Sequence, residues 1–347
     1  MLGRSTGVRT GRRRVLLVVV VLGGSVLSAC GGVGGTAALT LYSGQHEQTT
    51  QALVSGFEKA TGIQVAVRYD DEDTLANQIV TEGAHSPADI IYTENSPALE
   101  YLQERHLLSP VEPSTLARTP ARFDSPEGDW VGVSARVSVL VYNPRLIGRS
   151  RLPTTVLAMA DPRYRGKLAL APGETDFQPI VTSVDRTDGR AATLRWLAGL
   201  KANAEGHLYP DNETITDEVN RGAVAFGVIN QYYWYRLRAE IGASNMHSSL
   251  AYFAPGDPGY VIDVSGAAVL RSSKHQASAQ RFLAFLVSPR GQELIAHSDS
   301  FEYTIASGVR ADDGETPFDR LRPNRIGVPA LGDGSTAIGL LRQAGLL

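Results

Sequence analysis

Apolar side chains recur in two kinds of pattern from residue 39 onward. Short apolar runs typical of strands occupy residues 39–42, 65–69 and 88–92. Helices are predicted at residues 49–60, where apolar side chains recur at helical spacing, and at 74–82; Gly62 supplies a stop for the first helix. Strands that alternate with helices in this way predict a parallel sheet.

The pattern changes around residue 131, where the predicted strands become longer. Long strands are expected at residues 137–142 and 260–270, and a second strand and helix series at 167–171, 191–201 and 223–229. Further helices are expected at residues 277–286 and 336–344. We therefore predict an α/β fold with two lobes, joined by one long strand near 130–142 and another near 260–270.

The first 29 residues have the order of features that marks a secretory signal peptide. Arginines come first, without any acidic residue, at positions Arg4, Arg9, Arg12, Arg13 and Arg14. An apolar run at residues 15–22 follows, and then a tail of small residues at 23–29. The run is shorter than the roughly 20 residues that a membrane-spanning helix needs. Residues 1–29 are therefore predicted to be a signal peptide.

Cys30, the only cysteine of the chain, directly follows Leu27-Ser-Ala29. This tail resembles the bacterial lipobox, in which the cysteine becomes the lipidated first residue of the mature protein. The alternative is a simple signal peptide followed by an incidental cysteine. The glycines at residues 31–35 are typical of a flexible tether. We predict an exported lipoprotein, anchored to the outer face of the cytoplasmic membrane by Cys30, with residues 30–38 as anchor and tether.

The charge of the mature chain argues against nucleic acid as a partner. Loss of five arginines and no acids with residues 1–29 takes the formal net charge from −3 to −8. An acidic chain without a basic stripe is a poor candidate for binding nucleic acid. The histidines are scattered without the spacing of an HExxH site, and no G-x-S-x-G, Walker or dinucleotide-binding motif occurs. We therefore expect a binding protein and not an enzyme.

Polar and aromatic side chains follow three of the predicted strands. Ligands of parallel α/β sheets bind beyond the carboxyl ends of the strands. The side chains at those ends are His46, Glu94, Tyr232 and Tyr233. Each has an alternative role: a solvated loop histidine, an acid favoured by a helix dipole, and two aromatics packed with Trp234. Their occurrence at three strand ends favours a binding site.

Two adjacent tyrosines serve one ligand only if they lie on a helix. The side chains of neighbours on a strand point to opposite faces. On a helix, the directions of neighbouring side chains differ by a rotation of only about 100° around the helix axis. If a helix begins directly behind the strand that ends near residue 229, Tyr232 and Tyr233 can converge. The start of that helix would also favour the phenolate form.

An imidazole, a carboxylate and two phenols form a donor set rich in hard oxygen. This set disfavours copper(I) and structural zinc, which prefer thiolates or several histidines. Calcium and magnesium prefer carboxylates and carbonyls. Fe(III) can displace phenolic protons despite a free pKa near 10. Glu94 and two phenolates carry three negative charges, which balance Fe(III).

At these residues the chain resembles the ferric-ion-binding proteins of bacterial ABC importers, the periplasmic "bacterial transferrin" family. The matching motifs run in order along most of the mature chain: Leu39-Thr-Leu-Tyr-Ser-Gly-Gln-His46, Ser86-Pro-Ala-Asp-Ile-Ile-Tyr-Thr-Glu94, Ile229-Asn-Gln-Tyr-Tyr-Trp234, Ser265-Gly-Ala-Ala-Val-Leu270 and Phe282-Leu-Ala-Phe-Leu-Val-Ser-Pro-Arg-Gly-Gln292, ending near Glu302-Tyr303. The resemblance implies a two-lobed periplasmic-binding-protein type II fold with hinge-crossing strands that closes on Fe(III). It implies that the iron ligands are His46, Glu94, Tyr232 and Tyr233. It also implies that a monomeric protein delivers the iron to an ABC permease.

Several members of that family complete the iron coordination with an exogenous anion, usually phosphate or carbonate. The polar positions expected around that anion are Asn95, Asn212 and Asn230. Arg136 is expected to offset the anion's charge.

The chain departs from the family at the loop that would hold the anion. The family's small, serine-containing loop is replaced by Pro172-Gly-Glu-Thr-Asp-Phe177. Glu174 and Asp176 in this loop would repel a phosphate. Two interpretations stay open: Thr175 or Asp176 caps the next helix, or a carboxylate from this loop replaces the anion.

The lobe limits and three alternative functions are also predicted. Lobe 1 is predicted at residues 39–136 plus 263–312, and lobe 2 at 137–262 plus 313–347. The alternative function is the same fold binding an organic solute such as a polyamine, a phosphonate or thiamine, with Tyr232 and Trp234 as an aromatic wall and Glu94 pairing an ammonium group. An exported hydrolase ranks third, and a lipoprotein sensor or scaffold is a further class.

Overall fold

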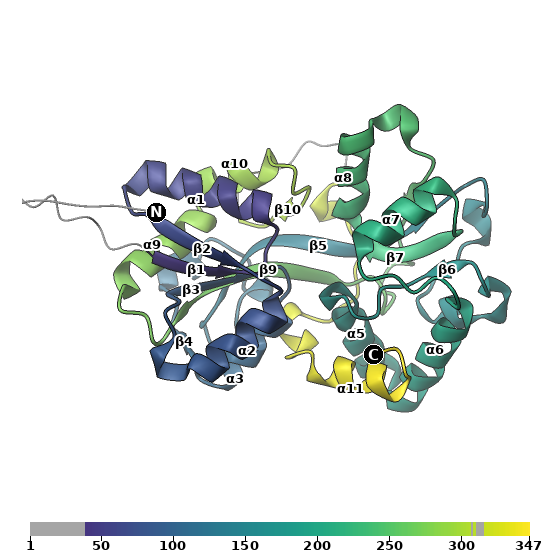
Figure 1. The fold of residues 1–347 in the computed structure, drawn as a ribbon, viewed down its shortest axis with the longest axis horizontal. Helices are drawn as coiled ribbons and strands as arrows, with labels where there is room; N and C mark the ends of the chain where they lie inside the picture. The colour runs from purple at the N-terminus through teal and green to yellow at the C-terminus, as the bar shows by residue number, and fades with distance from the viewer. Residues whose placement is uncertain (1–38, 307, 310–315) are drawn as a thin grey trace, which may run out of the picture. The chain divides into compact units, whose positions relative to one another are not determined.

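The computed structural model describes residues 39–306, 308–309 and 316–347, and ten strands of this part of the chain form one mixed sheet (Figure 1). The predicted signal peptide, Cys30 and the tether lie outside the described residues. The strands are β1 (Leu39–Ser43), β2 (Val65–Tyr69), β3 (Ile90–Thr93), β4 (Leu108–Ser109), β5 (Val131–Tyr142), β6 (Leu168–Ala169), β7 (Phe226–Asn230), β8 (Ser249–Ala251), β9 (Ile262–Leu270) and β10 (Tyr303–Thr304). The main path through the sheet has the order β2-β1-β3-β9-β5-β7-β6.

Eleven α-helices pack around this sheet in the described residues. They are α1 (Glu47–Thr61), α2 (Glu72–Glu82), α3 (Pro97–Glu104), α4 (Pro113–Leu116), α5 (Gln178–Asp188), α6 (Arg190–Asn203), α7 (Asn212–Arg221), α8 (Gln231–Ile241), α9 (Gln276–Leu286), α10 (Pro289–Ala296) and α11 (Ser335–Gln343). None of the helices in the described ranges is both long and apolar enough to cross a bilayer.

The two long strands expected from the sequence lie at the centre of the sheet. β5 pairs antiparallel with β9 over residues 131–137 and then with β7 over residues 138–142. Both β5 and β9 are buried along their whole length. The prediction of a parallel sheet is only partly right: β1 is parallel to β2 and β3, and β6 to β7, whereas β5 and β9 run antiparallel to their main neighbours. The described residues form a single compact unit, and the lobe limits given above stay a prediction.

Local sequence explains the elements on either side of the site. α1 buries Leu53 and Phe57 on one face and ends at Gly62, whose φ of 73° confirms the predicted left-handed stop. α8 begins directly after β7, so that Tyr232 and Tyr233 belong to its first turn. The apolar patterns described above did not locate α3, α4, α5, α7 or α10.

Candidate metal centre

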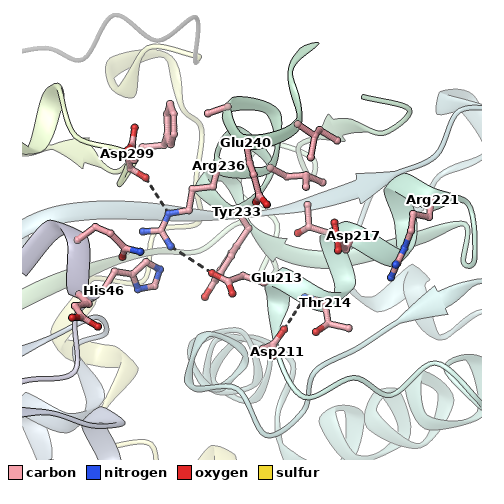
Figure 2. A pocket seen from close by; sticks show the side chains of 17 residues that line it. His46, Asp211, Glu213, Thr214, Asp217, Arg221, Tyr233, Arg236, Glu240 and Asp299 are labelled. Carbon is pink, nitrogen blue, oxygen red and sulfur yellow. Dashed lines mark hydrogen bonds and ion pairs between the residues drawn. The ribbon is translucent and has the colours of Figure 1, made fainter. Parts of the chain in front are cut away.

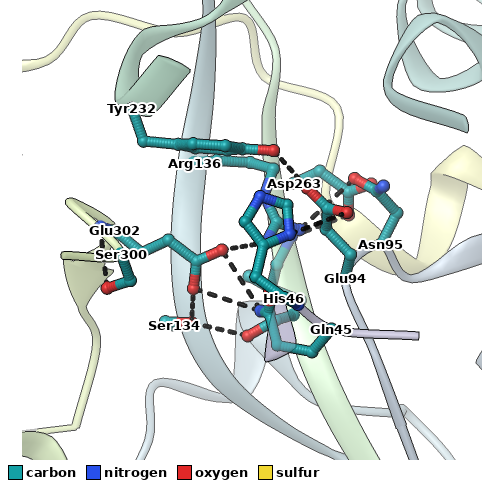
Figure 3. Close-up of polar contacts among 12 residues, drawn as sticks. Gln45, His46, Glu94, Asn95, Ser134, Arg136, Tyr232, Asp263, Ser300 and Glu302 are labelled. Atoms are coloured by element: carbon teal, nitrogen blue, oxygen red, sulfur yellow. Dashed lines mark hydrogen bonds and ion pairs between the residues drawn. The ribbon is translucent and has the colours of Figure 1, made fainter. Parts of the chain in front are cut away.

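Four side chains expected at strand ends lie in one cluster. His46 follows β1, Glu94 follows β3, and Tyr232 and Tyr233 open α8 directly after β7. The Nδ1 atom of His46 lies 3.5 Å from Oε2 of Glu94, and the Tyr232 hydroxyl donates a hydrogen bond to Oε1 of the same carboxyl group (Figure 3). The carboxyl ends of β1, β3 and β7 thus bring an imidazole, a carboxyl and two phenols together.

The two tyrosine rings converge because both belong to the first turn of α8. Their centroids lie 4.2 Å apart, and the ring planes are tilted by 35°. The His46 ring lies 5.3 Å from the Tyr232 ring and 6.1 Å from the Tyr233 ring, measured between centroids. Both tyrosines are buried. The helical arrangement required for a shared ligand is therefore present.

Gly44 brings the loop that carries His46 against the start of α2. The backbone N–H of Gly44 donates to the Tyr92 carbonyl at 2.8 Å. A Cβ atom at this position would lie 2.6 Å from Cβ of Glu72, a distance that real Cβ atoms do not reach. Only glycine allows this approach without moving α2.

Burial sets the protonation of the cluster. It raises the pKa of Glu94, and together with the carboxylates of Asp176 and Glu94 it raises the pKa of Tyr232 and Tyr233 well above the usual 10.0. Burial also lowers the pKa of His46 to about 3. Without a cation the phenols keep their protons and the imidazole is neutral. A metal that binds here must therefore displace phenolic protons.

The phenols decide whether this cluster can hold a metal. Counting only His, Cys, Asp and Glu side chains, the described residues contain no group of three or more that could hold a metal ion. The phenols of Tyr232 and Tyr233, whose rings lie beside His46, are the further donors available to a metal in this cluster. Phenolate oxygen is a hard, anionic donor, which favours a strongly acidic cation such as Fe(III).

An unpredicted buried ion pair lies beside the cluster (Figure 3). Glu302 and Arg136 form it, and both side chains are 0% exposed. Burial alone would raise the pKa of Glu302, but Arg136 and a hydrogen bond from Ser134 lower it below its usual 4.5. The Arg136 guanidinium, which was expected to offset a bound anion, also donates to Oδ1 of Asn95 at 3.3 Å. In the structure its charge is compensated by Glu302.

Gln45 connects this ion pair to His46. Its Nε2 donates to Oε1 of Glu302 at 3.2 Å, and its Oε1 accepts the backbone N–H of His46 at 2.7 Å. Glu72 holds Asn95 in a similar way, because it accepts the backbone N–H at 2.8 Å and the side-chain amide at 3.2 Å. No sequence signal identified Gln45, Glu72 or Glu302, because an isolated polar residue has no period that reports its burial.

Asp176 points into the cluster from the loop that replaces the family's anion loop. Its Oδ1 accepts from Nδ2 of Asn95 at 3.1 Å, and its Oδ2 accepts from Nδ2 of Asn212 at 2.7 Å. Burial and the nearby Glu94 raise the pKa of Asp176 to about 6. The capping interpretation is wrong, since α5 starts after Phe177 and has no side-chain cap.

Three further candidates from the sequence, Glu174, Thr175 and Asn230, lie around Asp176. Oγ1 of Thr175 accepts from Nδ2 of Asn95 at 3.2 Å. Glu174 is half-buried, and burial together with Asp176 and Glu94 raises its pKa to about 9. Asn230, at the end of β7, helps to line a cavity of about 10 Å³ beside Asp176. Such a volume holds about one water molecule.

A larger cavity, of about 1070 Å³, opens beside His46 and Tyr233 (Figure 2). Its acidic lining residues are Glu47, Asp211, Glu213, Asp217, Glu240 and Asp299, against two arginines, Arg221 and Arg236. Arg236 donates to the Asp299 carbonyl at 3.1 Å and lies 3.8 Å from a Glu213 carboxylate oxygen. The excess of carboxylates makes this approach to the cluster favourable for a cation.

The sequence and the fold both match known proteins. Residues 52–316 match the family model described as bacterial extracellular solute-binding protein. The chain is 36% identical over 331 residues to the Fe(3+)-binding periplasmic protein of Serratia marcescens, a match that covers 95% of this chain and 97% of the relative.

Two solved structures extend the comparison to the fold. Iron-bound HitA from Pseudomonas aeruginosa matches with a TM-score of 0.85 and 41% identity, over 89% of this chain and 99% of that chain. Trichodesmium IdiA (FutA), in complex with iron and citrate ligands, matches with a TM-score of 0.78 and 28% identity, over 89% of this chain and 99% of that chain. The predicted two-lobed α/β fold is confirmed by these matches.

Proposed function

Because the chain belongs to the family of bacterial extracellular solute-binding proteins, and its relatives include periplasmic ferric-iron-binding proteins, we propose that it captures Fe(III) between its lobes. The observation that carries this proposal is the convergence of His46, Glu94, Tyr232 and Tyr233 on one position. These four side chains are the proposed iron ligands. The proposed role is transport, and it includes no catalytic step.

The geometry favours Fe(III) over other cations for a physical reason. Burial holds protons on both phenols, so the cation must be acidic enough to displace them. The positive charge of the bound Fe(III) then offsets the negative charges of Glu94 and the two phenolates, in a buried site where water does not screen these interactions. The acidic lining of the large cavity supports the approach of a cation.

Delivery completes the proposed role. The chain would be exported, held at the outer face of the cytoplasmic membrane by lipidated Cys30, and would present iron to an ABC permease as a monomer. Ligands from β1, β3 and β7 meet at one metal, so iron stabilises the closed arrangement of the lobes. Small-angle scattering should show a more compact mature chain with iron than without, and equal compactness would contradict closure.

The test of the proposal is the iron content of the mature chain, residues 31–347, after incubation with ferric citrate and desalting. One iron per chain is expected, measured by mass spectrometry of the metal. A chain that retains no iron would refute the proposal.

A second candidate is a cationic organic solute. The large cavity combines six carboxylates with Tyr233 and Phe301, which suits the ammonium groups and methylenes of a polyamine. Calorimetric titration with spermidine in the iron-free protein distinguishes the two. Binding of spermidine without retention of iron would transfer the assignment to this candidate.

A further inference from the structure

The carboxylate of Asp176 is held at the metal centre without a cation of its own. The residue is 7% exposed, and its two oxygens accept hydrogen bonds from the amides of Asn95 and Asn212. Within the described ranges, no arginine, lysine or histidine forms an ion pair with it. A buried carboxylate without a cationic partner is costly, and that cost falls when a metal ion binds beside it.

Asp176 also contacts one of the proposed iron ligands directly. The hydroxyl of Tyr232 lies 3.4 Å from Oδ2 of Asp176 and donates to Oε1 of Glu94, so that one phenol oxygen lies between two carboxyl groups. We propose that Asp176 is a fifth protein ligand of the metal and that the chain therefore binds Fe(III) without a free anion. This inference rests on the proposed function.

The small cavity beside Asp176 has no room for an exogenous anion, whereas the larger cavity adjoins His46 and Tyr233. The cavity lined by Asn95, Asp176 and Asn230 has a volume of about 10 Å³, enough for about one water molecule and too small for phosphate or carbonate. The side-chain amides of Asn95 and Asn212, which would donate to such an anion, already donate to Asp176.

The charges around Asp176 act in the same direction. The Glu94 carboxyl lies in the same cluster as Asp176, so a free anion would meet a second acidic group there. Arg136, the nearest buried guanidinium, is paired with Glu302. A carboxylate fixed in the chain supplies the hard anionic oxygen that Fe(III) favours, without the entropy of capturing a free ion.

The test begins with the wild-type mature chain. It is loaded with ferric iron supplied as the nitrilotriacetate complex, in buffer free of phosphate and carbonate, and compared with the same protein in millimolar phosphate. The affinity and the position of the visible absorption band are expected to be equal in both. Bound phosphate, measured by colorimetric assay, is expected to be absent from the iron-loaded protein. One phosphate or carbonate per iron in that protein would overturn the proposal, whatever the behaviour of any variant.

Two substitutions of the same residue then separate a ligand from a structural role. Asp176→Asn keeps the shape of the side chain and removes its charge; it should weaken iron binding at least about tenfold, shift the visible band and gain nothing from phosphate. Asp176→Ala opens space, so added phosphate or carbonate should restore part of the lost affinity. Asp188→Asn, an exposed acid at the end of α5, is the matched control and should bind iron as wild type does.

The failure of this inference can be told apart from failure of the proposed function. A wild-type chain that retains no iron refutes the proposed function. A wild-type chain that retains iron with a tyrosinate band, while Asp176→Asn keeps the same affinity and the same band, refutes only the role of Asp176.

Discussion

The two sides of the metal centre are supported in different ways. On the side of β1 and β3, the loop carrying His46 is tied through Gln45 to the buried ion pair of Glu302 and Arg136. On the side of β7, the first turn of α8 is tied through a neutral amide: Gln231 accepts the Val137 N–H at 2.8 Å and donates to the Phe301 carbonyl at 3.0 Å.

Because of this difference, substitutions on one side should mainly change the stability of the fold, and substitutions on the other side should mainly change iron binding. A buried charge that loses its partner destabilises the folded chain strongly, so the side of β1 and β3 should respond to substitution mainly through folding. The side of β7 contributes phenol oxygens from a helix whose backbone does not need them. Substitution of these phenols should therefore remove binding and leave the fold intact.

The largest expected effect is on folding. Glu302→Gln keeps the size of the side chain and leaves the Arg136 charge buried without its partner, so the free energy of unfolding should fall by about 3–5 kcal/mol. Chemical denaturation of the iron-free chain measures this. The matched control is Glu293→Gln, which breaks the exposed pair with Arg290 and should cost less than about 0.5 kcal/mol. Equal effects of the two substitutions would contradict the contrast.

The next effect is on iron affinity. Tyr232→Phe and Tyr233→Phe each remove one anionic oxygen that no neighbour can replace, so affinity should fall by at least about 100-fold, more than for loss of an outer partner. Competition with citrate measures the affinity, and circular dichroism should be unchanged. Tyr235→Phe, on the same helix, should bind iron normally. If either single variant retains wild-type affinity, the hydroxyl that this variant lacks is not an iron ligand.

A smaller effect on iron affinity is expected from Gln45, which contacts the proposed ligand His46 only through its backbone. Gln45→Ala removes the link between Glu302 and the His46 backbone, so iron affinity should fall about tenfold. The visible band should keep its position, because both phenolates remain. A shifted band would show that Gln45 acts on the phenols and not on His46.

The smallest effect concerns a buried acid on the side of β1 and β3 that is remote from the ion pair. Burial, reinforced by Glu127, raises the pKa of Glu100 on α3 from 4.5 to about 7, opposite in direction to Glu302. A carboxyl with a raised pKa stabilises the folded chain below pH 4.5 and loses this contribution as pH rises through 7. Glu100→Gln should therefore raise the free energy of unfolding by about 1–2 kcal/mol near pH 8 and leave it unchanged near pH 4. The same change at both pH values would contradict this assignment.

The sequence predicted those parts of the molecule that have a local pattern. Short apolar runs located β1, β2 and β3, Gly62 located the end of α1, and the adjacency of Tyr232 and Tyr233 required a helix directly behind β7. Strand ends carry ligands in this class of fold, so the same patterns also indicated which side chains would meet.

The remaining parts depend on contacts between distant segments. Glu302 is buried because it meets Arg136 and Gln45, which are 166 and 257 residues away along the chain. The antiparallel direction of β5 and β9 depends on which strand each one pairs with, which no local period reports. The position of the Asp176 carboxylate depends on two amides from other elements, so the loop sequence alone left both capping and anion replacement open.

The central claim is that both phenols bind Fe(III), and an absorption titration of the mature chain, residues 31–347, with ferric citrate tests it most directly. A broad visible charge-transfer band is expected, which saturates at one iron per chain and is absent from the variant with both Tyr232→Phe and Tyr233→Phe. A colourless titration of the wild-type chain, or the wild-type band in the double variant, would contradict it.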